Sequence, residues 1–587
     1  MDDLDRASIL PERELPDADS LLAEGRHLAR TVRVGPCPFL TEYAVASESE
    51  YKRRRMGEGR IMLHAQVGYR SQEKSRRALG EIHDRVAAAG YRVDRYGICL
   101  DWSMGYPAAQ RASMPRGTGL ILDGPGDFVA LTQCAPVAPH FGDFVLGTPA
   151  ALENTVSALL AGATTIGNMG QFFTFRMPRW TDDVGPTAET VKALALCAAQ
   201  PTEVLIHSNL DDGFASLFCD LACGIGAVLL ERHIVEDLIG ARMSHCYGHT
   251  FSDPLSRLAF QRALSRVSPH PGSMVYGNTT IYGAGEVENY ANLASYLLTD
   301  ILAQATLPSG HGLNPVPVTE AMRIPEVGEI VDAHLFANRL IQRAEGYLPL
   351  LDLSRADALA TRMVEGGRAF KDNALKGLRE AGIDTGNPFE LLLAVRRIGA
   401  RRMEERFGPG KPQAGALRGR DPVVRATTVA ALAAQGRGVA DTLGAGDRAA
   451  MRGAGFRACV TCTDVHEYGK ILVETALEAL GVAVCDAGVS AEPEDVARRA
   501  LADRSDFIAV STYNGVALGF LKDLCREMDR LGLRLPIFIG GKLNQVPEDS
   551  ADSLPVDVSA ELEALGATVC LRVEELLPAL VRMAGRR

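Results

Sequence analysis

A short run of residues in the C-terminal third of the chain has the composition of a metal-binding loop. Asp464, His466 and Gly469 follow a predicted buried strand over residues 456–461, at the edge where open α/β sheets bind ligands. A histidine that ligates a metal through one ring nitrogen usually donates its other N–H to a carboxylate, which Asp464 supplies. Gly469 would let the backbone pass close to a bulky ligand. The spacing therefore predicts that His466 is a metal ligand and that Asp464 fixes its tautomer.

Two further motifs follow at the ends of later predicted strands. Ser511 ends the third predicted strand of this region, and Tyr513 lies two residues beyond it. Gly540 and Gly541 follow the fourth predicted strand. All three motifs should thus lie at the same edge of one parallel sheet, because the carboxyl ends of parallel strands meet there.

This set resembles the DxHxxG, SxL and GG pattern of the cobalamin-binding domains of B12-dependent mutases and methionine synthase, with Tyr513 in place of the leucine. The resemblance implies that His466 replaces the cofactor's own dimethylbenzimidazole as an axial ligand of cobalt. It also implies that the displaced nucleotide tail enters a slot lined by the serine and the glycines, with Tyr513 packing beside the tail. The alternative is a flavodoxin-like domain with an incidental loop histidine.

The N-terminal half shows a different repeat, in which short apolar stretches alternate with helical periodicity. Eight strand–helix repeats predict a (β/α)8 barrel, whose ligands bind at the carboxyl ends of the strands. The predicted strands are residues 61–66, 96–101, 119–123, 143–147, 163–168, 203–208, 243–248 and 274–280.

The remaining segments complete a four-part organisation. Residues 1–55 are expected to form an N-terminal arm, 56–330 the barrel, 331–450 a helical segment with a linker near 407–415, and 451–587 the cobalamin-binding domain. In the last part, five strands alternate with helices and predict a doubly wound, Rossmann-like parallel sheet. These strands are predicted at 456–461, 483–486, 507–511, 536–539 and 567–570.

Three segments of the predicted barrel resemble the large subunit of glutamate mutase. They begin at Gly147-Thr148-Pro149, at Cys246-Tyr247-Gly248-His249 and at Glu320-Ala321. The single-chain arrangement is similar to that of 2-methyleneglutarate mutase. The resemblance implies an adenosylcobalamin-dependent radical mutase, in which Glu320 contacts the ribose of the adenosyl group.

The same resemblance argues against glutamate as the substrate. Val145 and Gln66 stand where glutamate mutase has arginines that hold the substrate's carboxylates, and Gly167 stands where it has a glutamate that holds the amine. Neither valine nor glutamine can form a bidentate ion pair with a carboxylate. We therefore expect another small organic acid or a related molecule.

Polar residues near the predicted strand ends are the candidates for catalysis. They can hydrogen-bond a hydroxyl, amide or carbonyl group, and the histidines can move protons near neutral pH. The four preferred candidates are His207, His245, Asn168 and Asp101, and the same rim is expected to carry His64, Asn209, His249 and Asn278.

Composition excludes several classes of protein. A formal net charge of -11 without a basic block disfavours nucleic-acid binding. The absence of a signal pattern and of a long apolar run predicts a cytoplasmic protein without a membrane partner. We expect a homo-oligomer, a dimer, that acts on a small molecule. Two alternatives to the mutase stay open: a corrinoid methyltransferase using methylcobalamin, and a non-catalytic cobalamin sensor or carrier.

Overall fold

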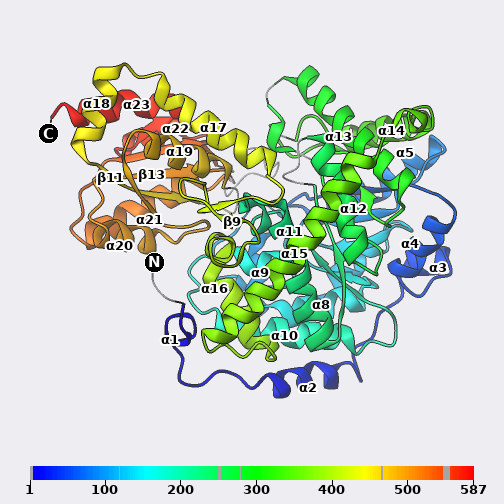
Figure 1. Cartoon of the computed structure of the whole chain (residues 1–587). Helices are drawn as coiled ribbons and strands as arrows, with labels where there is room; N and C mark the ends of the chain where they lie inside the picture. The colour runs from blue at the N-terminus through cyan, green and yellow to red at the C-terminus, as the bar shows by residue number, and fades with distance from the viewer. Residues whose placement is uncertain are drawn as a thin grey trace. The chain divides into compact units, whose positions relative to one another are not determined.

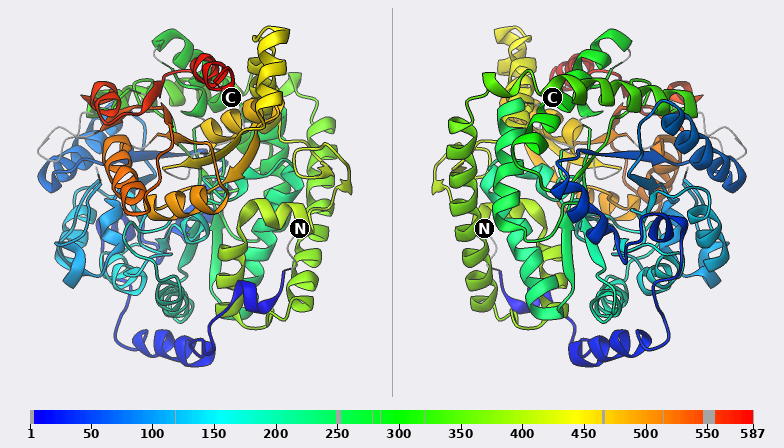
Figure 2. Two further views of the ribbon diagram at one scale, coloured as in Figure 1. Left: turned by 90° about the vertical axis from the view of Figure 1, so that its left-hand side faces the viewer. Right: turned by 90° about the vertical axis from the view of Figure 1, so that its right-hand side faces the viewer.

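The computed structural model divides the chain into two compact units. Unit 1 comprises Met1–Phe173 and Thr181–Ala426, and unit 2 comprises Thr174–Trp180 and Thr427–Arg587. The residues that the structure describes are 4–117, 119–248, 253–277, 279–283, 285–320, 322–463, 467–513, 515–545 and 556–586. Figures 1 and 2 present the whole chain, and each unit is treated by itself below.

Unit 1 contains eight short parallel strands arranged in two ladders. The first ladder has the order β3-β2-β1-β8-β7 and the second the order β4-β5-β6. An isolated parallel bridge between Tyr247 and Val275 connects the end of β6 to β7. The strands are β1 (Met62–Val67), β2 (Arg95–Ile98), β3 (Ala138–Phe141), β4 (Thr165–Ile166), β5 (Leu205–Ser208), β6 (Arg242–His245), β7 (Met274–Val275) and β8 (Gly312–Leu313).

Two of the predicted strands of this region are wrong. Residues 119–123 and 143–147 form loops, whereas the third strand is β3 and the eighth is the two-residue β8. Leu120, Leu122, Val145 and Leu146 are completely buried in these loops. Their apolar runs therefore reflect burial of a loop, in which Leu120 forms only an isolated parallel bridge with Leu100.

Helices separate and follow the strands of unit 1. Long helices occupy residues 327–407, and α15 packs on α11 and α12. In both Figures 1 and 2, α2 lies alongside α10. The helices before residue 408 are α1 (Arg6–Ile9), α2 (Ala18–Leu28), α3 (Pro38–Glu42), α4 (Glu48–Gly57), α5 (Gln72–Ala88), α6 (Ala108–Arg111), α7 (Pro125–Thr132), α8 (Ala151–Leu160), α9 (Gly170–Thr174), α10 (Val184–Ala198), α11 (Leu221–Arg232), α12 (Pro254–Val267), α13 (Glu286–Thr306), α14 (Val327–Ala344), α15 (Ser354–Glu380) and α16 (Pro388–Phe407).

The predicted linker near 407–415 forms part of an antiparallel hairpin. Its strands are β9 (Lys411–Pro412) and β10 (Arg420–Asp421). Arg420 anchors the hairpin, because its guanidinium donates to the carbonyl oxygens of Glu405 at 2.8 Å and Gly410 at 2.9 Å. The segment is therefore held to the end of α16.

Unit 2 is a doubly wound α/β domain, which confirms the predicted five-stranded parallel sheet. The strand order is β12-β11-β13-β14-β17. These strands are β11 (Arg457–Cys462), β12 (Ala483–Asp486), β13 (Phe507–Thr512), β14 (Ile537–Gly541) and β17 (Thr568–Cys570), and a small hairpin pairs β15 (Asn544–Gln545) with β16 (Val556–Asp557). The helices are α17 (Thr427–Asp441), α18 (Ala445–Ala454), α19 (Tyr468–Ala479), α20 (Pro493–Ala502), α21 (Ala517–Arg530), α22 (Ser559–Ala564) and α23 (Leu576–Ala584).

An apolar layer covers each face of this sheet, as the alternation of buried strand residues requires. Val460 and Phe507 belong to one layer, with residues of α17, α18, α19 and α23. Cys459 and Ile508 belong to the other, with residues of α20, α21 and α22. Figure 1 shows α18 and α23 on one side of the strands and α20 and α21 on the other.

Within the described part of the chain, none of the helices combines the length and the apolar character that a membrane crossing requires.

Candidate functional site

The loop that carries the predicted cobalt ligand lies between β11 and α19. Asp464 and His466 fall outside the described residues, but both ends of the loop are described. At one end, Thr463 donates its backbone N–H to the carbonyl oxygen of Ser511 at 3.0 Å. At the other end, Glu467 precedes the first turn of α19. The loop therefore starts and ends at the carboxyl edge of the sheet, where a ligand of this fold binds.

Gly469 lies in close contact with Ser511. A Cβ atom added at Gly469 would clash with the Ser511 hydroxyl oxygen. A larger residue there would require the Ser511 side chain to turn away. The DxHxxG glycine and the SxL serine are thus neighbours in space, which fits the binding slot that the sequence pattern implies.

The glycine pair keeps the end of β14 free of side chains. A Cβ atom at Gly540 would lie 2.5 Å from the carbonyl oxygen of Cys570, and one at Gly541 would clash with the carbonyl oxygen of Thr512. Gly541 also has a φ of +108°, which favours glycine. The glycines therefore let β14 pack closely against β13 and the end of β17, and this pair adds no side chain that would obstruct the nucleotide tail of a cobalamin at the edge.

Tyr513 lies beside the same edge. The ammonium nitrogen of Lys542 lies 4.1 Å from the centroid of the Tyr513 ring, within the range of a cation–π contact. Next to Tyr513 in the sequence, the hydroxyl of Thr512 accepts a hydrogen bond from the hydroxyl of Thr463 at 3.0 Å. The carboxyl edge therefore presents hydroxyl, aromatic and ammonium groups together.

A buried ion cluster holds the first turns of α19, and sequence reasoning missed it. The Lys470 ammonium, fully buried, lies 2.8 Å from a carboxylate oxygen of each of Glu467, Glu474 and Asp486. Burial lowers the pKa of Lys470, but the three carboxylates together raise it by a larger amount. The net shift of the pKa is therefore upward. Burial raises the pKa of Glu474 despite the opposing effect of Lys470. The signal in the sequence was a lysine between two glutamates at helical spacing, directly after Gly469.

In unit 1, a group of buried charged side chains includes Arg95, the first residue of β2. Lys52 and Arg95 both contact one oxygen of Glu48 at 2.9 Å. Burial alone would raise the pKa of Glu48, but the charges of Lys52 and Arg95 lower it to about 2. Arg95 also donates to Nδ1 of His64 at 3.2 Å. Because a guanidinium only donates, His64 must carry its proton on Nε2.

That proton is directed toward Gln66 on the same strand. His64 Nε2 lies 2.8 Å from Oε1 of Gln66, whose amide group donates to the Cys99 thiol at 3.0 Å. Burial and the nearby Arg95 charge hold the pKa of His64 well below its usual range, so the ring is neutral. A Cβ atom at Gly97 would clash with the Gln66 amide and lie 2.7 Å from His64 Nε2. The chain of contacts thus orients the amide of Gln66.

His207 lies among other buried polar groups. Its Nδ1 is 2.7 Å from the Ser273 hydroxyl, and its ring packs edge-on against His140 with centroids 4.5 Å apart. Burial, followed by the neighbouring His140 and the Arg95 charge, keeps the pKa of His207 well below 6.5. A Cβ atom at Gly167 would lie 2.6 Å from the His207 ring.

His245 and His207 do not share a site. The register pairs His207 with Ser244 and Ser208 with His245, so the two histidines point to opposite faces of neighbouring strands. His245 Nε2 lies 3.2 Å from Glu231 of α11, which also accepts a hydrogen bond from the Ser208 hydroxyl at 2.7 Å. His245 therefore contacts the helix layer.

Asp101 organises a loop. Its carboxylate accepts hydrogen bonds from the backbone N–H groups of Ser103 at 2.8 Å and of Gly117 and Gly119 at 3.0 Å. These bonds hold the loop after β2 over the strand ends. The observed contacts of Asp101 therefore stabilise the backbone of this loop.

Asn168 connects the ends of neighbouring strands. Its amide oxygen accepts from the backbone N–H groups of Gly170 and Asn209, both at 2.9 Å. Its side chain also hydrogen-bonds Asp143, which opposes a rise in the pKa of that carboxyl. Burial and the Asp212 charge still raise the pKa of Asp143 to about 6. Sequence reasoning missed Asp143 because it placed that residue at the start of a strand.

Glu320 belongs to the same neighbourhood. Burial, followed by the nearby Glu320 and Asp212 carboxylates, raises the pKa of Tyr276 well above its usual range. Tyr276 follows β7 and Asp212 follows β5, so several strand ends contribute. Of the remaining rim candidates, His249 and Asn278 lie outside the described residues.

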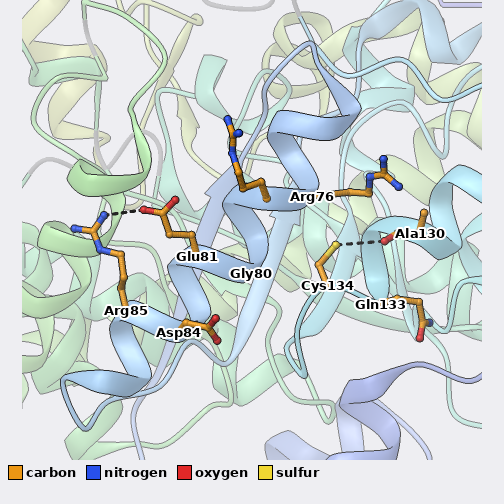
Figure 3. Close-up of a pocket in the computed structure, with 9 residues that line it drawn as sticks. Arg76, Gly80, Glu81, Asp84, Arg85, Ala130, Gln133 and Cys134 are labelled. Atoms are coloured by element: carbon orange, nitrogen blue, oxygen red, sulfur yellow. Dashed lines mark hydrogen bonds and ion pairs between the residues drawn. The ribbon is translucent and has the colours of Figure 1, made fainter.

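A separate depression of about 690 Å³ lies on the helix layer of unit 1. Figure 3 shows its lining residues from α5 and from the end of α7, with Glu81 turned toward Arg85. That ion pair measures 3.1 Å, and the Cys134 thiol donates to the Ala130 carbonyl oxygen at 3.3 Å. The lining residues lie on α5 or at the end of α7 and not at the strand ends.

Comparison with known families identifies the part of the chain around the strand-end motifs. Residues 458–565 match a family model described as the B12 binding domain. The match begins in β11, spans Gly469, Ser511 and the glycine pair, and ends just after α22. This chain therefore carries a B12-binding domain in its C-terminal region, which supports a cobalamin-dependent protein.

Proposed function

We propose that the protein is an adenosylcobalamin-dependent mutase that rearranges a small substrate other than glutamate within a (β/α)8 barrel formed by unit 1. The observation that carries the proposal is the pairing of a B12-binding domain with eight parallel strands in sequence order on one chain. When bound, adenosylcobalamin supplies a carbon radical through homolysis of its cobalt–carbon bond.

Strand pairing supports the closure of the barrel. β1 pairs with both β2 and β8, and the Tyr247–Val275 bridge links the end of β6 to β7. Between β3 and β4, His140 Nδ1 lies 3.0 Å from the carbonyl oxygen of Thr165. The strand order of a (β/α)8 barrel accounts for each of these contacts.

The chain's own residues would then hold the substrate and exclude water. Asn168, Asp143 and Glu320 lie at or beyond strand ends, where ligands of this fold bind. The buried polar layer of His64, Arg95 and His207 lies deeper, on the strands themselves. An enclosed site protects a reactive carbon from water and from stray hydrogen donors.

The geometry at two positions supports a substrate other than glutamate. Val145 is completely buried, so this position offers no polar group to a carboxylate. At Gly167 the His207 ring occupies the space that a side chain would need. A longer residue there would require the ring to move. These two positions, which hold glutamate in the related family, are thus apolar or closed in this chain.

The test combines the bound cofactor with a variant of the cobalt ligand. In the cobalt(II) form of the 15N-histidine-labelled protein, electron paramagnetic resonance should show hyperfine splitting from a protein nitrogen. His466→Ala should abolish that splitting and weaken cobalamin binding, whereas His27→Ala, at an exposed position, should do neither.

Two results would contradict the proposal. Splitting from dimethylbenzimidazole alone in the wild type would overturn the assignment of His466. A copurified methyl rather than adenosyl upper ligand would favour a corrinoid methyltransferase.

A further inference from the structure

Lys542 directly follows the glycine pair and is held in place from two sides. Its backbone N–H donates to the carbonyl oxygen of Thr512 at 2.9 Å, which ties the end of β14 to the end of β13. Its ammonium nitrogen lies 4.1 Å from the centroid of the Tyr513 ring. Both side chains are half-buried. The ammonium group is therefore positioned at the edge that Gly540 and Gly541 leave free of side chains.

The nucleotide tail of cobalamin carries one negative charge, on its phosphodiester. A tail that follows the glycine edge brings this charge into a half-buried region, where an anion needs a charged or strongly donating partner. The Ser511 hydroxyl and backbone N–H groups can donate hydrogen bonds but carry no charge. An ammonium group supplies a compact positive charge of the kind that binds phosphate.

We propose that Lys542, supported by the face of the Tyr513 ring, binds the phosphodiester of the cobalamin tail. The proposal rests on cobalamin binding by this domain and adds to it a specific contact. It also explains the aromatic residue where the related pattern has leucine, because an aromatic face stabilises a cation and a leucine does not.

Three ligands with the same upper group separate this contact from the rest of the site. Adenosylcobalamin has the phosphodiester and the base, adenosylcobinamide phosphate has a phosphate without the base, and adenosylcobinamide has neither. Spectral titrations would compare the full-length wild type with Lys542→Met and with the control Lys522→Met, which changes an exposed lysine of α21.

Lys542→Met should weaken the binding of the first two ligands by about tenfold, the size expected for one charge-assisted hydrogen bond. Binding of adenosylcobinamide should stay within about twofold of the wild type, which also shows that the variant folds. Lys522→Met should leave all three affinities unchanged. Added NaCl should weaken adenosylcobalamin binding more in the wild type than in Lys542→Met, because salt screens the charge contact.

Other outcomes would overturn the assignment. An equal loss for all three ligands would make Lys542 a structural residue, and a loss for adenosylcobalamin alone would assign the contact to the base. No loss at all would remove Lys542 from the site. If the wild type bound none of the ligands, cobalamin binding itself would fail, a result distinct from the failure of the lysine contact.

Discussion

The two units of this chain bury polar groups in different ways. In unit 1, histidines and charged side chains occupy the strands themselves, as at His64, Arg95 and His207. In unit 2, an apolar layer covers each face of the sheet, and the buried Lys470 cluster lies at the start of α19. An interior lined with polar groups can position a polar substrate, whereas an apolar sheet mainly supports the loops at its edge. The proposed function follows this difference, with the chemistry in unit 1 and cofactor binding in unit 2.

The largest effect that separates the units should come from acid. Burial holds the pKa values of His64, His140 and His207 well below 6.5, that of His311 at about 3 and that of His334 at about 4. Below pH 6.5 the unfolded chain binds protons that these buried histidines do not bind in the folded state, so the stability of unit 1 falls as the pH decreases from 6.5 to about 3. At pH 5 each histidine can cost up to about 2 kcal/mol.

Unit 2 contains a single histidine, His466, and should be much less sensitive in this range. Urea titrations at pH 7 and pH 5, followed by proteolysis and mass spectrometry of peptides from each unit, would measure the difference. Earlier unfolding of unit 2 peptides at pH 5 would contradict the comparison.

The second effect concerns the charge cluster of unit 2. Lys470→Met removes the cation from among three carboxylates, and we expect it to destabilise unit 2 by about 3–5 kcal/mol, because unpaired buried charges are costly. Chemical denaturation followed by peptides of unit 2 would measure the loss, with Lys522→Met as the exposed control. A loss below about 1 kcal/mol, the size of a surface ion pair, would mean that water reaches the carboxylates readily.

The units also differ in how well the sequence predicts them. In unit 2, the five strands lie within a few residues of their predicted positions because each is a continuous apolar run between turn residues. In unit 1, β3 contains Pro139 and His140, and β8 has two residues, so neither has an apolar pattern. The buried loops around Leu120 and Val145 instead have the apolar runs that are typical of strands.

The candidate site shows the same contrast. The cobalamin motif was predictable because its residues follow long, recognisable strands at fixed spacing. Asp143 and Tyr276 were not, because their proximity to other strand ends depends on how short strands pair across the sheet. The Lys470 cluster joins α19 to the end of β12, a contact that helical spacing alone does not reveal.

The smallest predicted effect concerns the packing of the apolar layer of unit 2. Substitutions at two glycines of α17, Gly436 and Gly438, would measure how tight this packing is. A Cβ atom at Gly436 would clash with the Thr475 hydroxyl and lie 2.7 Å from the carbonyl oxygen of Leu472, whereas nothing lies within 4 Å of one at Gly438. The Thr475 hydroxyl also donates to Ile471 at 2.8 Å, so it cannot turn away freely. Gly436→Ala should therefore destabilise unit 2 by about 1–3 kcal/mol, the range for overpacking.

Gly438→Ala should instead stabilise unit 2 by about 0.5–1 kcal/mol, because alanine loses less backbone entropy in a helix than glycine. The same denaturation experiment measures both variants, and each serves as the control for the other. If both were stabilising, α17 would have to separate from α19 without cost, and the apolar layer would be looser than its buried residues indicate. Opposite signs would instead locate the tight contact beside α19, the helix whose first turn follows the predicted cobalt ligand. The packing of α17 would then contribute to fixing the position of α19.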